Sequence, residues 1–89
     1  MYALKNKELI TEYNIFCKNV KYYRNLKKMT QEALAEEADL SISYIKQIES
    51  GIEFKNVSLT TMLKLSKALD IHVRDYFKIK INKKRPIWG

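Results

Sequence analysis

Apolar residues recur along the chain at intervals of three or four positions, the period of helices that bury one face. The longest such stripe comprises Ile10, Tyr13, Phe16, Val20, Tyr23 and Leu26. Shorter stripes follow at Leu34 and Ala38, at Ile45 and Ile48, and at Leu59, Met62, Leu65, Ala68 and Leu69. Only two glycines and one proline interrupt the sequence, which disfavours a sheet made of hairpins. The pattern therefore predicts an all-α fold.

Three hydroxyl residues mark the starts of predicted helices. Thr30, Ser41 and Ser58 each offer a side-chain oxygen that can accept a hydrogen bond from a free amide of the first turn. Each is preceded by an apolar residue and followed four positions later by another, the pairing that fixes how a chain enters a helix. These apolar pairs are Met29 with Leu34, Leu40 with Ile45, and Val57 with Met62. None of the three starts is a full capping box, because the third helical position holds no Glu or Gln.

The stripes and the helix starts together predict five helices, spanning about 11–27, 31–38, 42–50, 59–69 and 73–77. Gly51 is placed to end the third of them in a left-handed conformation. Residues 77–81 alternate between apolar and polar, the period of a short strand, and a basic run follows. We therefore expect one helical domain over residues 1–77 and a basic C-terminal tail over residues 78–89.

The charge is strongly positive but unevenly distributed. Lys and Arg outnumber Asp and Glu by 17 to 10, a net charge of +7, which favours nucleic acid as a partner ahead of an anionic membrane. Residues 29–50 instead carry five carboxylates against one lysine, a local net charge of −4, so Glu36 and Glu37 should face away from any phosphate. No apolar run approaches the roughly 18 residues of a membrane-spanning helix, and no signal peptide is evident. We expect a cytoplasmic protein that is not bound to a membrane.

The sequence contains no pattern typical of an enzyme or a metal site. The one cysteine, Cys17, lies among apolar residues and argues against a disulfide framework or a cysteine-built zinc site. His72 has no thiol or carboxylate pattern around it. No nucleophile–base pair, glycine-rich phosphate loop or pair of catalytic carboxylates can be found. We therefore expect no catalytic residue, no metal and no cofactor.

The predicted helices 31–38 and 42–50 are joined by only Asp39, Leu40 and Ser41. Two short helices joined so tightly must cross steeply, as in a helix-turn-helix. The apolar residues fit this arrangement, with Ala35 placed where the two helices approach most closely. The spacing alone fits an ordinary helical hairpin of a bundle equally well.

The stretch MTQEALAEEADLSISYIKQIESG (29–51), followed by SLTTMLKLSKALDI (58–71), resembles the phage-repressor and Cro-type helix-turn-helix family, also called XRE-type. The resemblance extends over about residues 16–77 and implies a five-helix, lambda-repressor-like DNA-binding domain. It also implies a structural ion pair between Arg24 and Glu49. The chain departs from the family pattern at three turn positions often held by glycine, which are Lys28, Asp39 and Asp70. The loop 52–57 is longer than usual and lacks the usual proline.

The resemblance assigns helix 42–50 as the recognition helix, and local chemistry agrees. Contacts to DNA bases are expected from Ile42, Ser43, Lys46 and Gln47. Glutamine can bond bidentately to adenine, serine can donate or accept, isoleucine can pack on a thymine methyl, and the lysine can reach guanine or phosphate. Contacts to phosphates are expected from Gln31, Tyr44, Lys28, Lys55 and Asn56, with Gln31 at the positive end of its helix. For each residue the alternative is a solvated polar side chain.

By this resemblance the chain is a transcriptional regulator, of the repressor kind, that binds an inverted repeat in double-stranded DNA as a homodimer. The alternative, from another class, is a protein-binding module such as the antitoxin of a toxin–antitoxin pair that also represses its own promoter. A third interpretation, an anionic-membrane binder, rests on Trp88 beside the basic tail and has little apolar area to insert.

The dimer contact is predicted near the C-terminus, at Tyr76, Phe77, Ile79 and Ile81. A short strand is not stable alone, so its expected partner is the same strand of a second subunit, antiparallel across a two-fold axis. The competing interpretation of the tail is a disordered basic arm that attracts DNA by charge alone.

Overall fold

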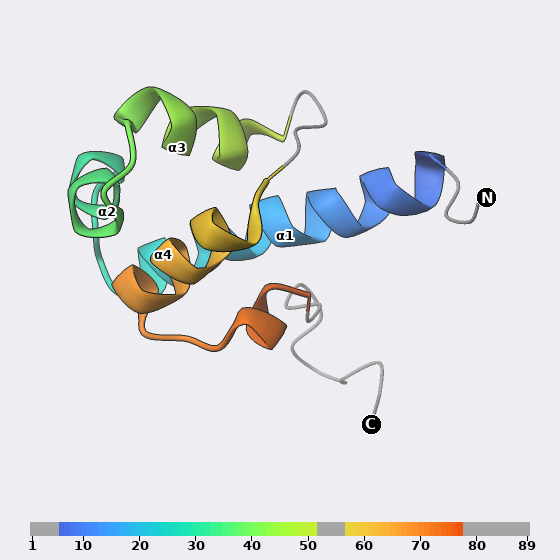
Figure 1. Ribbon diagram of the computed structural model, residues 1–89. Coiled ribbons are helices and arrows are strands. Elements are labelled where there is room, and N and C mark those ends of the chain that lie inside the picture. The colour runs from blue at the N-terminus through green and yellow to red at the C-terminus, as the bar shows by residue number, and fades with distance from the viewer. Residues whose placement is uncertain (1–5, 52–56, 78–89) are drawn as a thin grey trace.

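The computed structural model describes residues 6–51 and 57–77 and is all-helical over them (Figure 1). Its elements in chain order are α1 (Asn6–Leu26), α2 (Gln31–Ala38), α3 (Ile42–Ser50), α4 (Leu59–Leu69) and a 3₁₀-helix η1 (Val73–Phe77). The predicted bounds of the second, third and fourth helices are confirmed. The predicted tail 78–89, with Ile79 and Ile81, lies outside the described residues, as do Lys55 and Asn56.

The fifth predicted helix lies at the expected residues, but it is a 3₁₀-helix. Val73–Phe77 forms a 3₁₀-helix, with the Asp75 amide donating to the His72 carbonyl at 2.9 Å. The Asp75 side chain in turn accepts a hydrogen bond from the His72 amide at 3.1 Å. The tighter helix suits a short segment that directs one tyrosine inward. The structure therefore has four α-helices over the described residues and not five.

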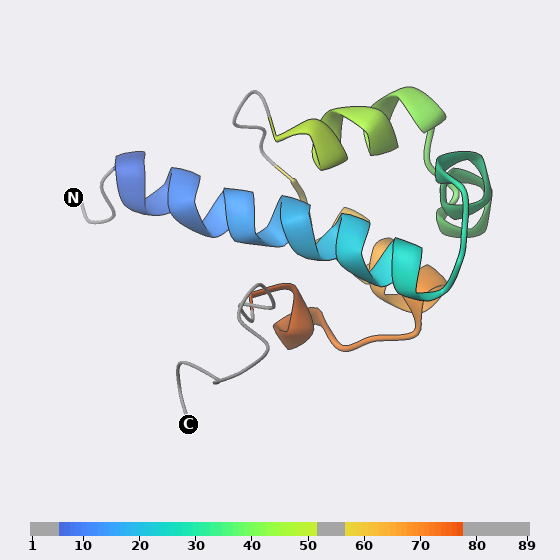
Figure 2. The same ribbon diagram turned by 180° about the vertical axis from the view of Figure 1, so that it is seen from behind.

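Helix α1 begins earlier than predicted, at Asn6, because the helix continues beyond the part that is buried. Its first turns project past the other helices (Figures 1 and 2). The predicted stripe was too long at both ends, since Ile10 is 45% exposed and Leu26 is 61% exposed. Glu8 lies in the first turn, where a negative charge stabilises the amide end of a helix. Among the described residues, no helix is both long and apolar enough to cross a membrane.

One hydrophobic core joins all five elements. The side chains at its centre are at most 3% exposed, and they are Phe16, Cys17, Val20, Leu34, Ala38, Ile45, Ile48, Leu65, Leu69 and Tyr76. Each large apolar residue among them contributes roughly 1.5–3 kcal/mol by leaving water. Because α1 contacts α3, α4 and η1, it is the element around which the others are arranged.

Tyr76 fixes η1 onto the core. Its ring packs edge-on against Phe16, with the ring centres 5.0 Å apart. Its hydroxyl donates to the Met62 carbonyl and accepts from Ser66, both at 3.2 Å, while Asn19 donates to its backbone carbonyl at 2.6 Å. Burial raises the pKa of Tyr76 to about 12, which the Ser66 hydrogen bond partly offsets. The hydroxyl therefore stays protonated at neutral pH and keeps its role as a donor.

The three predicted helix caps are confirmed. The Thr30 hydroxyl accepts from the Ala33 amide at 2.9 Å, and Ser41 and Ser58 accept from Tyr44 and Thr61 at 3.1 Å. The flanking apolar residues Met29, Leu40, Val57 and Met62 pack against the core. Each cap satisfies one of the free amides at a helix start, so the chain enters each of these helices at a defined residue.

Left-handed residues end the helices. Asp39, Asp70 and Lys28 all have φ of 58°, and Gly51 has φ of 61°. After α1, α2 and α4 the next amide also reaches back to a carbonyl five residues earlier, as from Leu40 to Ala35 at 2.9 Å. The connections are therefore short, with four residues between α1 and α2 and three residues after each of α2 and α4. Lysine tolerates this backbone less well than Asp or Gly, so Lys28 is a strained position.

Replacing Lys28 with glycine should raise the free energy of unfolding by about 1 kcal/mol, because glycine adopts the left-handed region without the Cβ penalty. In a domain of this size that corresponds to a rise of roughly 4–8 °C in Tm. Thermal unfolding followed by circular dichroism measures it. Asp70→Gly is the control and should gain less, since Asp already tolerates positive φ. A Lys28→Gly variant no more stable than the wild type would show that the turn is not strained.

Candidate nucleic-acid interface

Arg24 and Glu49 form a two-point ion pair that connects α1 to the end of α3. Arg24 Nε donates to Glu49 Oε2 at 2.6 Å, and Nη2 donates to Oε1 at 3.0 Å. The guanidinium also donates through Nη1 to the Met29 carbonyl at 2.7 Å. The two side chains are only 11% and 3% exposed. The structure thus brings together the two residues for which an ion pair was predicted.

Gln31 connects a third helix, α2, to this ion pair. Its Nε2 donates to Glu49 Oε1 at 3.0 Å, so the first residue of α2 is bonded to the last turn of α3. Glu49 therefore accepts hydrogen bonds from two other helices, and the three helices are held at fixed angles to one another. A charged pair of planar, bidentate geometry is well suited to this, because it fixes both distance and orientation.

The outer face of α3 is polar and open to solvent. Of the residues predicted to contact bases, Ser43, Lys46 and Gln47 are exposed, while Ile42 is half-buried and packs against the core. Tyr44, predicted to contact phosphate, is also half-buried against the core. The opposite face of the helix, at Ile45 and Ile48, is fully buried. The helix therefore presents a narrow polar stripe.

The predicted phosphate-binding residues beside α2 lie in the α1–α2 turn and the first turn of α2. Lys28 is exposed, and Gln31 is partly exposed at the helix start, where amides and the helix dipole attract an anion. The α2 carboxylates Glu32, Glu36 and Glu37 are exposed as well. Asp39 lies 3.7 Å from Lys64, but with 95% of the Asp39 side chain exposed this contact contributes little.

The residues predicted to form a dimer contact differ in accessibility. Tyr76 is fully buried inside the protomer, whereas Phe77 is 41% exposed. Sequence reasoning missed two exposed apolar residues on α4, since Leu59 was assigned to the buried stripe and Leu63 was not singled out. They are 63% and 51% exposed. Their four-residue spacing, offset from the stripe of Met62, Leu65 and Leu69, was the available signal.

Comparison with known proteins identifies a family that shares this architecture. Residues 20–76 match the family model described as "Helix-turn-helix". The chain is 41% identical over 59 residues to the control protein C.SmaI of Serratia marcescens, covering 66% of this chain and 68% of that protein. It is 49% identical over 47 residues to the control protein C.BamHI of Bacillus amyloliquefaciens, covering 53% of this chain and 56% of that protein.

Two solved structures are similar over nearly their whole length. One is the restriction-modification controller protein C.AhdI of Aeromonas hydrophila, with a TM-score of 0.68 and 37% identity, covering 75% of this chain and 98% of that one. The other is the N-terminal DNA-binding domain of SinR from Bacillus subtilis, with a TM-score of 0.69 and 29% identity, covering 78% and 99%.

Breaking the Arg24–Glu49 pair should destabilise the fold strongly. Arg24→Met or Glu49→Met alone leaves a buried charge without its partner and should cost about 3–5 kcal/mol in the free energy of unfolding. The double variant should cost less than the sum of the two single changes, since neither charge then remains. Chemical denaturation of the four proteins measures this coupling.

Lys64→Met is the control, because it removes a cation from an exposed and loose pair. It should change the free energy of unfolding by less than about 1 kcal/mol. Additive and small effects at Arg24 and Glu49 would show two independent surface charges and contradict the interpretation.

Proposed function

The chain belongs to the XRE-type helix-turn-helix family of DNA-binding transcriptional regulators, and on this basis we propose that it represses transcription in a restriction–modification system by binding an inverted repeat as a homodimer. The observation that carries the proposal is the polar stripe of α3, which is oriented by the Arg24–Glu49 pair and left open to solvent. The restriction–modification role is suggested by the relatives named as control and controller proteins.

Sequence recognition is assigned to the exposed stripe of α3. A helix of 9 residues is about 14 Å long and therefore spans about four base pairs of B-DNA. Ser43, Lys46 and Gln47 supply hydrogen-bonding groups of the kind that distinguish base edges in the major groove. The start of α2, with Gln31 and Lys28, then lies against the phosphates that flank the groove.

One α3 covers only about four base pairs, too few for a specific site, and a second copy is therefore expected. Two copies related by a two-fold axis double the site and give an inverted repeat. Exposed Leu59, Leu63 and Phe77 supply apolar surface for contact between copies, and the Phe77 ring stacks on Phe16 with the ring centres 6.4 Å apart. Repression follows when the bound dimer occupies promoter DNA that RNA polymerase would otherwise contact.

Gln47→Ala tests base recognition. The variant should lose roughly 1–3 kcal/mol of binding free energy and lose its preference at one base pair of each half-site, because a bidentate contact to a base is removed. Selection of bound duplexes from random DNA measures both effects. Gln31→Ala is the comparison and should weaken binding to all sequences alike. If Gln47→Ala selected the same sequence as the wild type, α3 would not be the reading helix.

A footprint of the wild-type protein tests the dimer. It should reveal an inverted repeat whose half-site centres lie about 10 base pairs apart, the spacing of one helical turn. Sedimentation equilibrium should give a dimer, and Phe77→Ser should shift it toward monomer. Tight binding by a strict monomer to a single unrepeated site would rule out the homodimer. Co-purification with a second protein that blocks DNA binding would favour the antitoxin alternative.

A further inference from the structure

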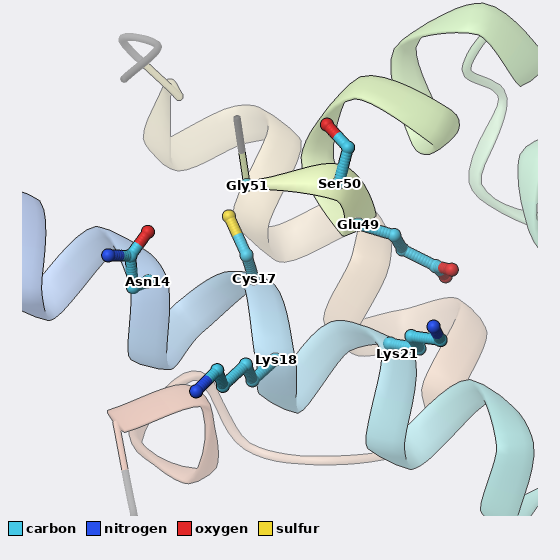
Figure 3. Close-up of a pocket in the computed structure, with 7 residues that line it drawn as sticks. All are labelled: Asn14, Cys17, Lys18, Lys21, Glu49, Ser50 and Gly51. Carbon is cyan, nitrogen blue, oxygen red and sulfur yellow. The ribbon is translucent and has the colours of Figure 1, made fainter. Parts of the chain in front are cut away.

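A pocket of about 350 Å³ lies between the middle of α1 and the end of α3 (Figure 3). Asn14, Lys18 and Lys21 line it from α1, and Ser50 and Gly51 line it from the end of α3. Cys17 points toward Gly51 and forms an apolar wall that is only 2% exposed. Burial raises the pKa of the Cys17 thiol, so this wall is uncharged at neutral pH.

The two lysines make the pocket positive. Spacings of four and three residues place Asn14, Lys18 and Lys21 on one face of α1. Lys18 and Lys21 are exposed, and neither forms an ion pair or hydrogen bond within the described part of the chain. Glu49 also lines the pocket, but its charge is neutralised by Arg24. Over the residues that the structure describes, the pocket therefore holds two cations, neither of them bonded to a carboxylate.

The pocket is continuous with the polar stripe of α3. Ser43, Gln47 and Ser50 follow one another on successive turns of that helix, and Ser50 is the residue that lines the pocket. The Ser50 hydroxyl donates to the Gln47 carbonyl at 2.8 Å, which orients it at the end of the stripe. A duplex that contacts Gln47 would bring its backbone close to this end of α3.

The net charge of the helix-turn-helix segment opposes the approach of DNA. Residues 29–50 have a net charge of −4, and the carbonyl end of α3 adds a partial negative charge. Duplex DNA carries a negative charge about every 1.7 Å along its axis. Cations from outside the segment must therefore meet the backbone beside the end of α3, and Lys18 and Lys21 are in position to do so.

We propose that this pocket receives one backbone phosphate of the operator, held by the ammonium groups of Lys18 and Lys21 with Asn14 as an additional donor. The proposal rests on the DNA binding proposed above and assigns to α1 a contact beside the base pairs that the last turn of α3 reads. Lysine suits this role as a flexible point charge with three donors. The contact adds affinity and fixes register without reading sequence.

The test compares the wild type with a Lys18→Gln/Lys21→Gln double variant on the selected operator across a salt series. Losing one phosphate contact per protomer should reduce the slope of log affinity against log salt by about 1.8 for a dimer. Between 50 and 200 mM salt the wild type should thus lose about tenfold more affinity than the variant. The selected sequence should be unchanged, and ethylation of one phosphate per half-site should stop interfering with binding.

Two further variants control the experiment. Arg74→Gln removes an exposed cation from η1, which lies on the other side of α1 from α3 (Figures 1 and 2), and should leave the slope unchanged. Lys18→Arg/Lys21→Arg keeps both charges and should retain the wild-type slope. Equal Tm values for the wild type and all three variants verify that the proteins are folded.

If the wild type binds its operator and the double variant shows the same salt slope and the same ethylation pattern, this assignment is overturned and the proposed function stays intact. A wild-type protein that binds no duplex would instead overturn the proposed function. Titration of the DNA-free protein with inorganic phosphate distinguishes the source of the phosphate. Saturable shifts of the Lys18 and Lys21 amides at millimolar phosphate, without any effect of the double variant on DNA binding, would indicate a site for a free anion and contradict the assignment.

Discussion

The buried ion pair between Arg24 and Glu49 is the contact on which the functional surface depends. It fixes the end of α3 to α1, and the hydrogen bond from Gln31 to Glu49 brings in the start of α2. Hydrophobic burial alone would hold these helices together but allow α3 to turn or slide, since apolar contacts have no strict geometry. The bidentate pair restricts that freedom, and the polar stripe of Ser43 and Gln47 is consequently held at one angle to the rest of the domain.

The charges are divided between elements in a way that the total of +7 conceals. Helix α2 carries exposed carboxylates and α3 carries one lysine and one carboxylate, whereas the middle and end of α1 and the following turn are basic. In the function we propose, α1, the turn after it and the start of α2 attract the DNA backbone, and α3 discriminates between bases.

Much of this could be predicted from the sequence because it is local. The caps at Thr30, Ser41 and Ser58 and the bounds of α2, α3 and α4 follow from side chains that act within one turn of themselves. What failed depended on tertiary packing. Periodicity could not show that α1 extends past the core, leaving Ile10 exposed, or that Leu59 faces solvent. The pocket beside Lys18 joins residues more than thirty positions apart, so no spacing in the sequence indicated it.

The most direct test of the account is to map which amides respond when duplex DNA is added to isotope-labelled protein, using nuclear magnetic resonance. We expect the largest shifts on the exposed stripe of α3, on the first turn of α2 and on the basic face of α1 around Lys21. We also expect the Arg24 Nε–H signal to persist in the complex, because the pair with Glu49 stays closed. Shifts confined to α4 and η1, with α3 unaffected, would contradict the assignment of α3 as the helix that reads DNA.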